Sequence, residues 1–177
     1  MLETVKETVP QGATVLEIAT GTGNIALSIS DKASRILATD ISLNMLKIAR
    51  KKVCKQNAIN ITFAERNIYD IAEKNNSFDI VIASQVLHLL DNPNKASREL
   101  RRVANKMVIL PMSFTKNLTG ISRAKVGFYK IFGFSPKREF DKESYAEFLI
   151  KMGFRNCQHI QIDGEIPMAV AIWRKNG

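Results

Sequence analysis

The chain has 177 residues, 45% hydrophobic and 24% charged, a composition typical of a single globular domain. Two cysteines and two histidines are too few for a disulfide framework or a zinc cluster. No apolar run approaches the roughly 20 residues of a membrane span, and the N-terminus lacks the apolar segment of a secretion signal. We therefore expect a cytoplasmic protein. The net charge of +9 favours a lysine-rich solvated surface, because no block of five consecutive basic residues occurs, and leaves a nucleic-acid partner as the alternative.

Short β-branched runs alternate with amphipathic stretches, which predicts a parallel sheet with crossover helices. Strands are expected at 14–18, 35–39, 61–64, 78–83 and 107–110, and helices at 24–30, after Ser42 and at 94–104. The run 78–83 is almost continuously apolar, as in a strand buried on both faces. The helix after Ser42, a suitable N-cap, is expected to bury Met45, Leu46, Ala49 and Val53 on one face.

The pattern changes after Pro111. Residues 112–140 are rich in aromatic and basic residues, and we expect them to form a substrate-side lid insertion within a single domain of residues 1–177. Asp141 is a suitable N-cap for a helix that ends near Met152, with Gly153 as its C-terminal stop. Two further strand-like runs, 157–162 and 168–173, have a short connection that suits an antiparallel pair. The sequence therefore predicts a Rossmann-like, doubly wound α/β fold with a mostly parallel seven-stranded sheet, one antiparallel strand near the edge and helices on both faces.

The strongest local signal is a glycine turn between the first strand and the following helix. Gly21 and Gly23 let the backbone approach a ligand closely and leave helix N–H groups facing it. Their spacing also matches the dinucleotide fingerprint, so NAD remains an alternative at this point. Glu17 favours a different ligand, because a carboxylate at the end of a buried strand is costly unless it is paired, and an amine or sulfonium would pair with it. Asp40, which ends the second strand, can accept both hydroxyls of a ribose in either ligand.

Four motifs, in this order and spacing, resemble those of the class I S-adenosylmethionine-dependent methyltransferases. They are Glu17-x-Ala19-x-Gly21-x-Gly23, Asp40-Ile41-Ser42 with Met45-Leu46, Ser77-Phe78-Asp79-Ile80-Val81, and Val86-Leu87-His88-Leu89-Leu90. The resemblance is dense over about residues 12–111 and looser near residues 151–154. Within the family, the chain is most similar to the type-11 group, which resembles the quinone-biosynthesis methyltransferases.

The resemblance implies a role for each matching residue. Those at the methionine and sulfonium end of S-adenosylmethionine would be Glu17, Ala19, Gly21 and Gly23. Those at the nucleoside would be Asp40 on the ribose and Ile41, Asn67 and Ile68 on the adenine. Those beside the departing methyl would be Ser84 and Gln85. No metal ligand is implied.

Three features depart from the family pattern. Ala19 stands where the family usually has glycine, which implies a backbone slightly further from the cofactor. Asn67 stands where aspartate is usual, and its amide oxygen can still accept the adenine amino proton. About 13 residues precede the first strand, fewer than in many relatives, which implies a more open pocket.

Methyl transfer is an in-line displacement, so the protein mainly aligns the nucleophile, methyl and sulfur. A general base helps only where the nucleophile loses a proton, and His88, just beyond the fourth strand, is the candidate; packing within 86–90 is the alternative. Phe128, Tyr129 and Phe132 have helical spacing, which more often indicates packing than recognition. The density of aromatic residues in this segment, and its place after the fifth strand, nevertheless favour an apolar or aromatic small-molecule acceptor.

Two other activities remain as alternatives. An RNA or protein methyltransferase would suit the basic composition, although the chain has no separate nucleic-acid-reading domain and no Asn/Asp-Pro-Pro-aromatic motif after the fourth strand. An NAD-dependent oxidoreductase would need a hydride-transfer acid such as a Tyr-x-x-x-Lys pair, which no tyrosine of the chain provides. The sequence therefore favours a small-molecule methyltransferase and leaves the attacked atom and the oligomeric state open.

Overall fold

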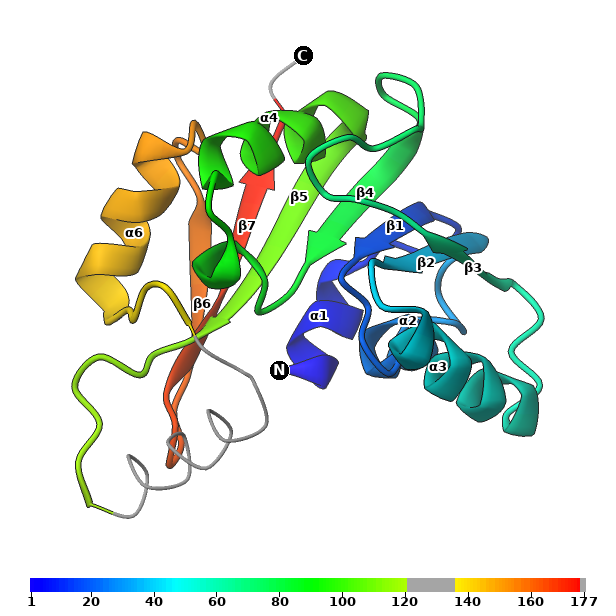
Figure 1. Ribbon diagram of the computed structural model, residues 1–177, viewed down its shortest axis with the longest axis horizontal. Coiled ribbons are helices and arrows are strands. Elements are labelled where there is room, and N and C mark those ends of the chain that lie inside the picture. The colour runs from blue at the N-terminus through cyan, green and yellow to red at the C-terminus, as the bar shows by residue number, and fades with distance from the viewer. Residues whose placement is uncertain (121–135, 176–177) are drawn as a thin grey trace.

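A computed structural model describes residues 1–120 and 136–175, and its centre is one seven-stranded sheet (Figure 1). The strands, in the spatial order β3-β2-β1-β4-β5-β7-β6, are β1 (Thr14–Ile18), β2 (Arg35–Asp40), β3 (Ile61–Glu65), β4 (Phe78–Ala83), β5 (Ala104–Ser113), β6 (Gln158–Ile162) and β7 (Met168–Arg174). The neighbours from β3 to β5 pair in parallel, whereas β7 is antiparallel to both β5 and β6. This confirms the predicted sheet, with β7 as the one reversed strand beside the edge.

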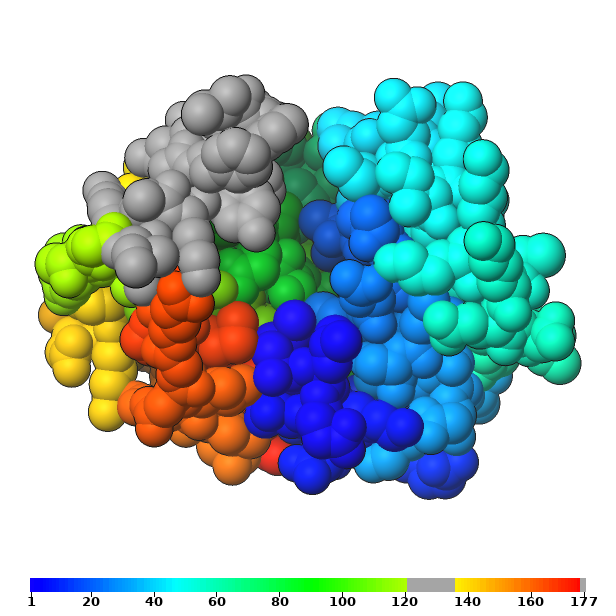
Figure 2. All heavy atoms as spheres, turned by 90° about the horizontal axis from the view of Figure 1, so that it is seen from below, coloured from blue at the N-terminus to red at the C-terminus, as the bar shows by residue number. Residues whose placement is uncertain are grey.

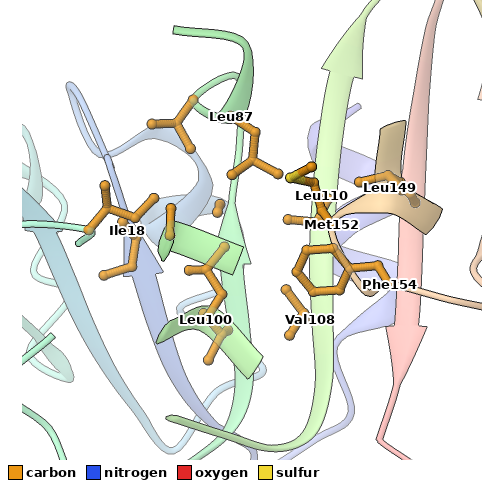
Figure 3. Close-up of a cluster of buried hydrophobic side chains, with 14 of the residues drawn as sticks. Ile18, Leu87, Leu100, Val108, Leu110, Leu149, Met152 and Phe154 are labelled. Atoms are coloured by element: carbon orange, nitrogen blue, oxygen red, sulfur yellow. The ribbon is translucent and has the colours of Figure 1, made fainter. Parts of the chain in front are cut away.

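Helices cover both faces of the sheet, as predicted. They are α1 (Leu2–Thr8), α2 (Asn24–Ser28), α3 (Leu43–Lys55), the short 3₁₀ helix η1 (Leu87–Leu89), α4 (Pro93–Val103) and α6 (Lys142–Lys151). On one face α4, α6 and η1 pack against alternate residues of the strands, and Figure 3 shows Leu100 of α4 and Leu149 of α6 pointing into that cluster. On the other face α1, α2 and α3 bury a second cluster around Val15, Ile80 and Ile82. None of the helices in the described part of the chain is long and apolar enough to cross a membrane.

Helix ends follow the sequence closely. The Ser42 hydroxyl accepts from the Met45 N–H at the start of α3, and Asp141 forms a capping box with Ser144 at the start of α6. Gly153 ends α6 with φ +86°, a conformation that favours glycine.

Met45 is a correction to the predicted buried face of α3. Leu46, Ala49 and Val53 are buried, but Met45 is 41% exposed. Neighbouring helical residues point about 100° apart, so Met45 falls outside a buried stripe that is only one residue wide at each turn.

The strand after α4 is longer than the predicted run 107–110. It extends to Ser113 because β7 pairs with it along residues 107–113. Pro111 is tolerated within β5 because the neighbouring strand β4 already ends at Ala83, so no ladder bond on that side needs its missing N–H.

The predicted lid, residues 112–140, is described only at its two ends, 112–120 and 136–140. Phe128, Tyr129 and Phe132 lie outside the described residues. Phe140 belongs to the core, with its ring centroid 5.4 Å from that of Tyr145 and 4.9 Å from that of Phe148. At least this aromatic residue of the segment therefore serves packing.

Candidate active site

A cavity of about 670 Å³ opens where β1, β4 and β5 end. Its lining residues come from the loops after these strands, from both described ends of the segment 112–140, and from more distant parts of the chain: Met1, Glu17, Ala19, Thr20, Thr22, Asn24, Ile25, Ser84, Gln85, His88, Met112, Ser113, Thr115, Pro136, Arg138, Phe140 and Ile166. Open α/β sheets bind ligands at this carboxyl edge. Figure 2 looks onto that edge, where the surface is hollowed beside the blue N-terminal segments.

Glu17 is the buried charged group of this cavity. It is 2% exposed, and its Oε2 accepts from the Thr20 hydroxyl at 2.6 Å and from the Ala26 N–H at 3.1 Å. Burial raises the pKa of Glu17 to about 7, against the effect of these two hydrogen bonds, and the like charge of Asp40 raises it further. Among the described residues no cation offsets this carboxylate. Glu17 therefore fits a cavity ligand that carries a positive charge, such as an amine or a sulfonium.

The two glycines of the turn serve different purposes. Gly21 has φ +55°, and a Cβ added there would meet nothing within 4 Å, which leaves open space for a ligand beside its backbone. Gly23 has φ +75°, and its Cβ would come 3.2 Å from the Cβ of Ala49, so this glycine allows the turn to pack closely on α3.

Ala19 lines the cavity in a backbone conformation that favours glycine. Its φ is +57°, in the left-handed region that costs an L-residue roughly 1–2 kcal/mol. The turn therefore keeps the geometry of a glycine loop even though a methyl group stands at this position.

Asp40 joins the glycine turn to the start of α3. Its Oδ2 accepts from the Gly21 N–H at 2.8 Å and its Oδ1 accepts from the Ser42 N–H at 2.8 Å. Ser42 is the N-cap of α3, and Asp40 accepts from the backbone N–H of Ser42, so both residues contribute to the start of this helix. Each carboxylate oxygen keeps a further lone pair with which it can accept from a ribose hydroxyl.

The remaining nucleoside residues lie outside the lining of the cavity, at the ends of β2 and β3. Ile41 is 68% exposed directly after Asp40, whereas Ile68 is buried in the core. The Oδ1 of Asn67 accepts from the Tyr69 N–H at 2.9 Å, so it shapes its own turn. Of the predicted site residues, the structure gathers Glu17, Ala19, Ser84, Gln85 and His88 around the cavity. The others do not line it: Gly21, Gly23, Asp40, Ile41, Asn67 and Ile68.

Gln85 connects the end of β4 to the end of β5 through hydrogen bonds. It has φ +52°, its N–H donates to the Pro111 carbonyl, its Nε2 donates to the Ser113 hydroxyl at 2.8 Å, and its Oε1 accepts from the Ser113 N–H at 3.2 Å. Ser84, its neighbour, also lines the cavity. These contacts fix the orientation of the Gln85 amide group in the cavity wall.

His88 lies in η1 and lines the cavity, where it is only 8% exposed. Burial lowers the pKa of the imidazole to about 4, so the ring is neutral near pH 7. The neutral imidazole can take up a proton, as the predicted general base must, but a pKa of about 4 makes it a weaker base than an exposed histidine.

Sequence reasoning placed the segment 112–140 on the substrate side but did not name the individual residues of it that line the cavity. Met112, Ser113 and Thr115 follow β5, and the rule that ligands bind at strand ends could have found them. Ile166, from the connection between β6 and β7, gave no local signal. Arg138 also lines the cavity; its Nη1 donates to the Leu90 carbonyl at 2.8 Å and its guanidinium lies 6.0 Å from the centroid of the Phe148 ring.

A family model of the methyltransferase domain matches residues 16–110, more than half of the chain. The demethylmenaquinone methyltransferase of Porphyromonas gingivalis is 34% identical over 107 residues, which are 56% of this chain and 44% of that protein. The ubiquinone/menaquinone biosynthesis C-methyltransferase UbiE of Rickettsia prowazekii is 31% identical over 129 residues, 68% of this chain and 51% of that protein. The chain thus spans about half the length of these curated relatives. A crystal structure of a methyltransferase candidate from Bacillus halodurans covers 99% of both chains with a TM-score of 0.78 at 16% identity, a likeness that shows the fold alone.

Proposed function

Since the chain belongs to the class I S-adenosylmethionine-dependent methyltransferases, we propose that it transfers the methyl group of S-adenosylmethionine to a nucleophilic O, N, C or S atom of a small molecule. The observation that carries the proposal is Glu17, a buried carboxylate in the cavity wall without a compensating cation among the described residues. A ligand with a positively charged amine and sulfonium gives this costly group a purpose. In the NAD alternative the glycine turn would hold the anionic pyrophosphate, which a carboxylate beside the turn would repel.

In this proposal the cofactor extends along the carboxyl edge of the sheet. Glu17 and the backbone around Gly21 hold its positively charged end. Asp40 accepts from the ribose, and the exposed Ile41 covers the adenine. Asn67 keeps a second lone pair on Oδ1 that can accept from the adenine amino group.

When bound, the cofactor supplies an activated methyl group on an excellent leaving group. The residues of this chain then orient the acceptor and exclude water. Gln85, fixed on Ser113, lies beside the reaction, and His88 takes the proton of an acceptor that must lose one.

We further propose an apolar, aromatic acceptor. The acceptor half of the cavity includes Met112, Phe140 and Ile166, which offer apolar contacts to a ring compound. The two relatives are named for demethylmenaquinone and for ubiquinone/menaquinone biosynthesis, which agrees with that class. Both described ends of the segment 112–140 contribute to the lining, which supports its role as an acceptor-side lid.

The proposal is tested by following S-adenosylhomocysteine formation with the acceptor class as the variable. One arm contains a panel of small phenols, quinols and aromatic amines, a second contains bulk tRNA, and a third contains an unrelated folded protein. We expect product in the first arm alone. Product with tRNA or protein alone would replace the small-molecule assignment by the macromolecular alternative.

A further inference from the structure

A second cavity, of about 490 Å³, lies at the opposite edge of the sheet. Its lining comes from the end of α4, the connection between α6 and β6, and the end of β7: Arg101, Arg155, Asn156, Trp173, Arg174 and Lys175. Arg174 pairs with Met107 near the start of β5, whereas Ser113 at the far end of β5 lines the active-site cavity. Six residues of strand separate these two positions, about 20 Å. The second cavity is therefore a separate place on the molecule.

The lining of this cavity is cationic, and among the described residues no carboxylate offsets it. None of Arg101, Arg155 and Arg174 forms an ion pair with a described residue. Arg155 and Arg174 are exposed. Neighbouring cations without a counter-charge repel one another, so an anion in this cavity would lower the energy of the whole group.

Arg101 is held in place before any ligand binds. Its Nε donates to the Ser97 carbonyl at 3.3 Å, and its guanidinium lies 5.7 Å from the centroid of the Phe154 ring. A Cβ at Gly153 would come within 2.7 Å of the guanidinium, which shows how closely the group packs on that backbone. Burial and the charge of Arg98 both lower the pKa of Arg101 from its ordinary value, because neither favours the cation. Arg101 is thus a fixed, partly buried cation whose charge has no partner among the described residues.

Lys175 contributes to the frame of the cavity. Its Nζ donates to Asn76 Oδ1 at 2.6 Å, to the Ala104 carbonyl at 2.9 Å and to the Arg101 carbonyl at 3.2 Å. These three bonds tie the end of β7 to the end of α4. Arg174 donates from Nη1 to Gln158 Oε1 at 3.1 Å, a neutral partner that leaves its charge without a counter-ion.

Trp173 adds an aromatic surface to the lining of this cavity. It is the single tryptophan of the chain, it is half-buried, and its ring packs edge-on against Phe154 with centroids 5.8 Å apart. A guanidinium group can donate two parallel hydrogen bonds to a phosphate group, and a tryptophan ring can stack on any nucleobase. The combination is the one by which proteins hold phosphorylated nucleosides without reading a base sequence.

We propose that the cavity of Arg101, Arg155, Trp173 and Arg174 binds a nucleoside phosphate, with the phosphate on Arg101 and Arg155 and the base against Trp173. Arg174, the next residue of β7, adds positive charge from the opposite face of the sheet. A free nucleotide and a single-stranded nucleic acid present this same chemistry. Because the cavity lies about 20 Å from the active site along β5, the bound unit is not the methyl acceptor. The site adds a second binding function to the domain.

Trp173 makes the proposal directly measurable, because its fluorescence is the sole tryptophan signal of the chain. The intact protein is titrated with AMP, with ADP, with an octamer of single-stranded oligo-uridine and with inorganic phosphate, each at 50 and 200 mM salt. We expect saturable fluorescence changes with the nucleotides or the oligonucleotide, weakened at least threefold by the higher salt. Comparable affinity for AMP, ADP and the octamer assigns a free nucleotide as the source, and at least tenfold tighter binding of the octamer assigns nucleic acid.

The variant Arg155→Gln/Arg174→Gln removes two exposed cations, so its fold is expected to persist. The control Lys51→Gln/Lys55→Gln removes the same charge from exposed positions of α3. We expect at least tenfold weaker binding in the arginine variant and less than a twofold change in the control. Equal losses in both variants, binding that the arginine variant retains, a response to inorganic phosphate equal to that of the nucleotides, or no fluorescence change at all would overturn the proposal.

Discussion

At the residue scale, Glu17, the carboxylate proposed to bind the cofactor, lowers the stability of the fold. The carboxyl has a pKa of about 7 in the folded chain, against 4.5 without the burial. Between these two values the unfolded chain loses its proton while the folded chain keeps it, so the free energy of unfolding falls as the pH rises from about 4.5 to 7. The full effect corresponds to about 3 kcal/mol above pH 7.

The variant Glu17→Gln tests whether the buried charge of Glu17 lowers stability while it serves cofactor binding. The amide oxygen can still accept from Thr20 and Ala26, but no charge is buried. We therefore expect Glu17→Gln to be more stable than the wild type by about 1–3 kcal/mol at pH 8.5 and not at pH 4.5, measured by urea denaturation, while its affinity for S-adenosylmethionine falls at least tenfold at pH 8.5. Lower stability at pH 8.5 would contradict the assignment of Glu17 as a costly buried charge.

The variant His88→Asn distinguishes a catalytic role of this residue from a packing role. If His88 takes up a proton from the acceptor, His88→Asn should lower kcat by about 10²–10⁴-fold for an acceptor that loses a proton, with little change in cofactor affinity. Since the pKa of His88 is about 4, kcat measured with saturating S-adenosylmethionine should stay level down to about pH 5 and decline below it. A variant with a kcat within threefold of the wild type would assign His88 to packing alone.

At the element scale, a buried hydrogen bond joins α6 to the sheet. The Tyr145 hydroxyl donates to the Leu110 carbonyl of β5 at 2.8 Å, and its ring lies against Phe140 and Phe114. Burial raises the pKa of this phenol well above its usual value, so it stays a hydrogen-bond donor.

Replacing Tyr145 by Phe keeps the ring and leaves the Leu110 carbonyl without this donor. We expect the free energy of unfolding to fall by about 1–3 kcal/mol, measured by thermal or urea denaturation. The control is Tyr69→Phe, because the Tyr69 hydroxyl merely accepts from the Asn92 N–H at 3.3 Å in an exposed turn. A loss for Tyr145→Phe no larger than that of the control would mean that α6 is held by apolar packing alone.

Local sequence patterns predicted the elements that carry their own signals. The strands around Leu16 and Val81 are short apolar runs bounded by turns, and α3 and α6 begin at the capping residues Ser42 and Asp141. The extent of β5 was missed because its pairing with β7 comes from residues about 60 positions away. The helix α1 gave no signal, since only Val5 within it is buried.

The same difference between local and distant signals applies to the site. Glu17, Ala19 and Gln85 were identified because they lie in motifs next to strand ends. Arg138 and Ile166 could not be, because tertiary packing alone brings their segments to the cavity. The positive φ of Ala19 could be expected only through the glycine that the family usually has there.

At the scale of the whole molecule, the two edges of one sheet carry different chemistry. The carboxyl edge has a mostly apolar cavity with one buried acid, and the opposite edge has an arginine-lined cavity with the single tryptophan. Part of the net charge of +9 lies at the arginine-lined cavity, away from the active site, so the basic composition is compatible with a small-molecule acceptor.

The most direct measurement of the central claim is calorimetry of the wild-type chain with S-adenosylmethionine, S-adenosylhomocysteine and NAD, alongside the variant Asp40→Ala. The account predicts micromolar binding of the first two ligands, no binding of NAD, and a loss of about 1–3 kcal/mol in the variant, the scale of charge-assisted hydrogen bonds to the ribose. Binding of NAD in place of the adenosyl compounds, or no heat with any of the three ligands, would contradict it.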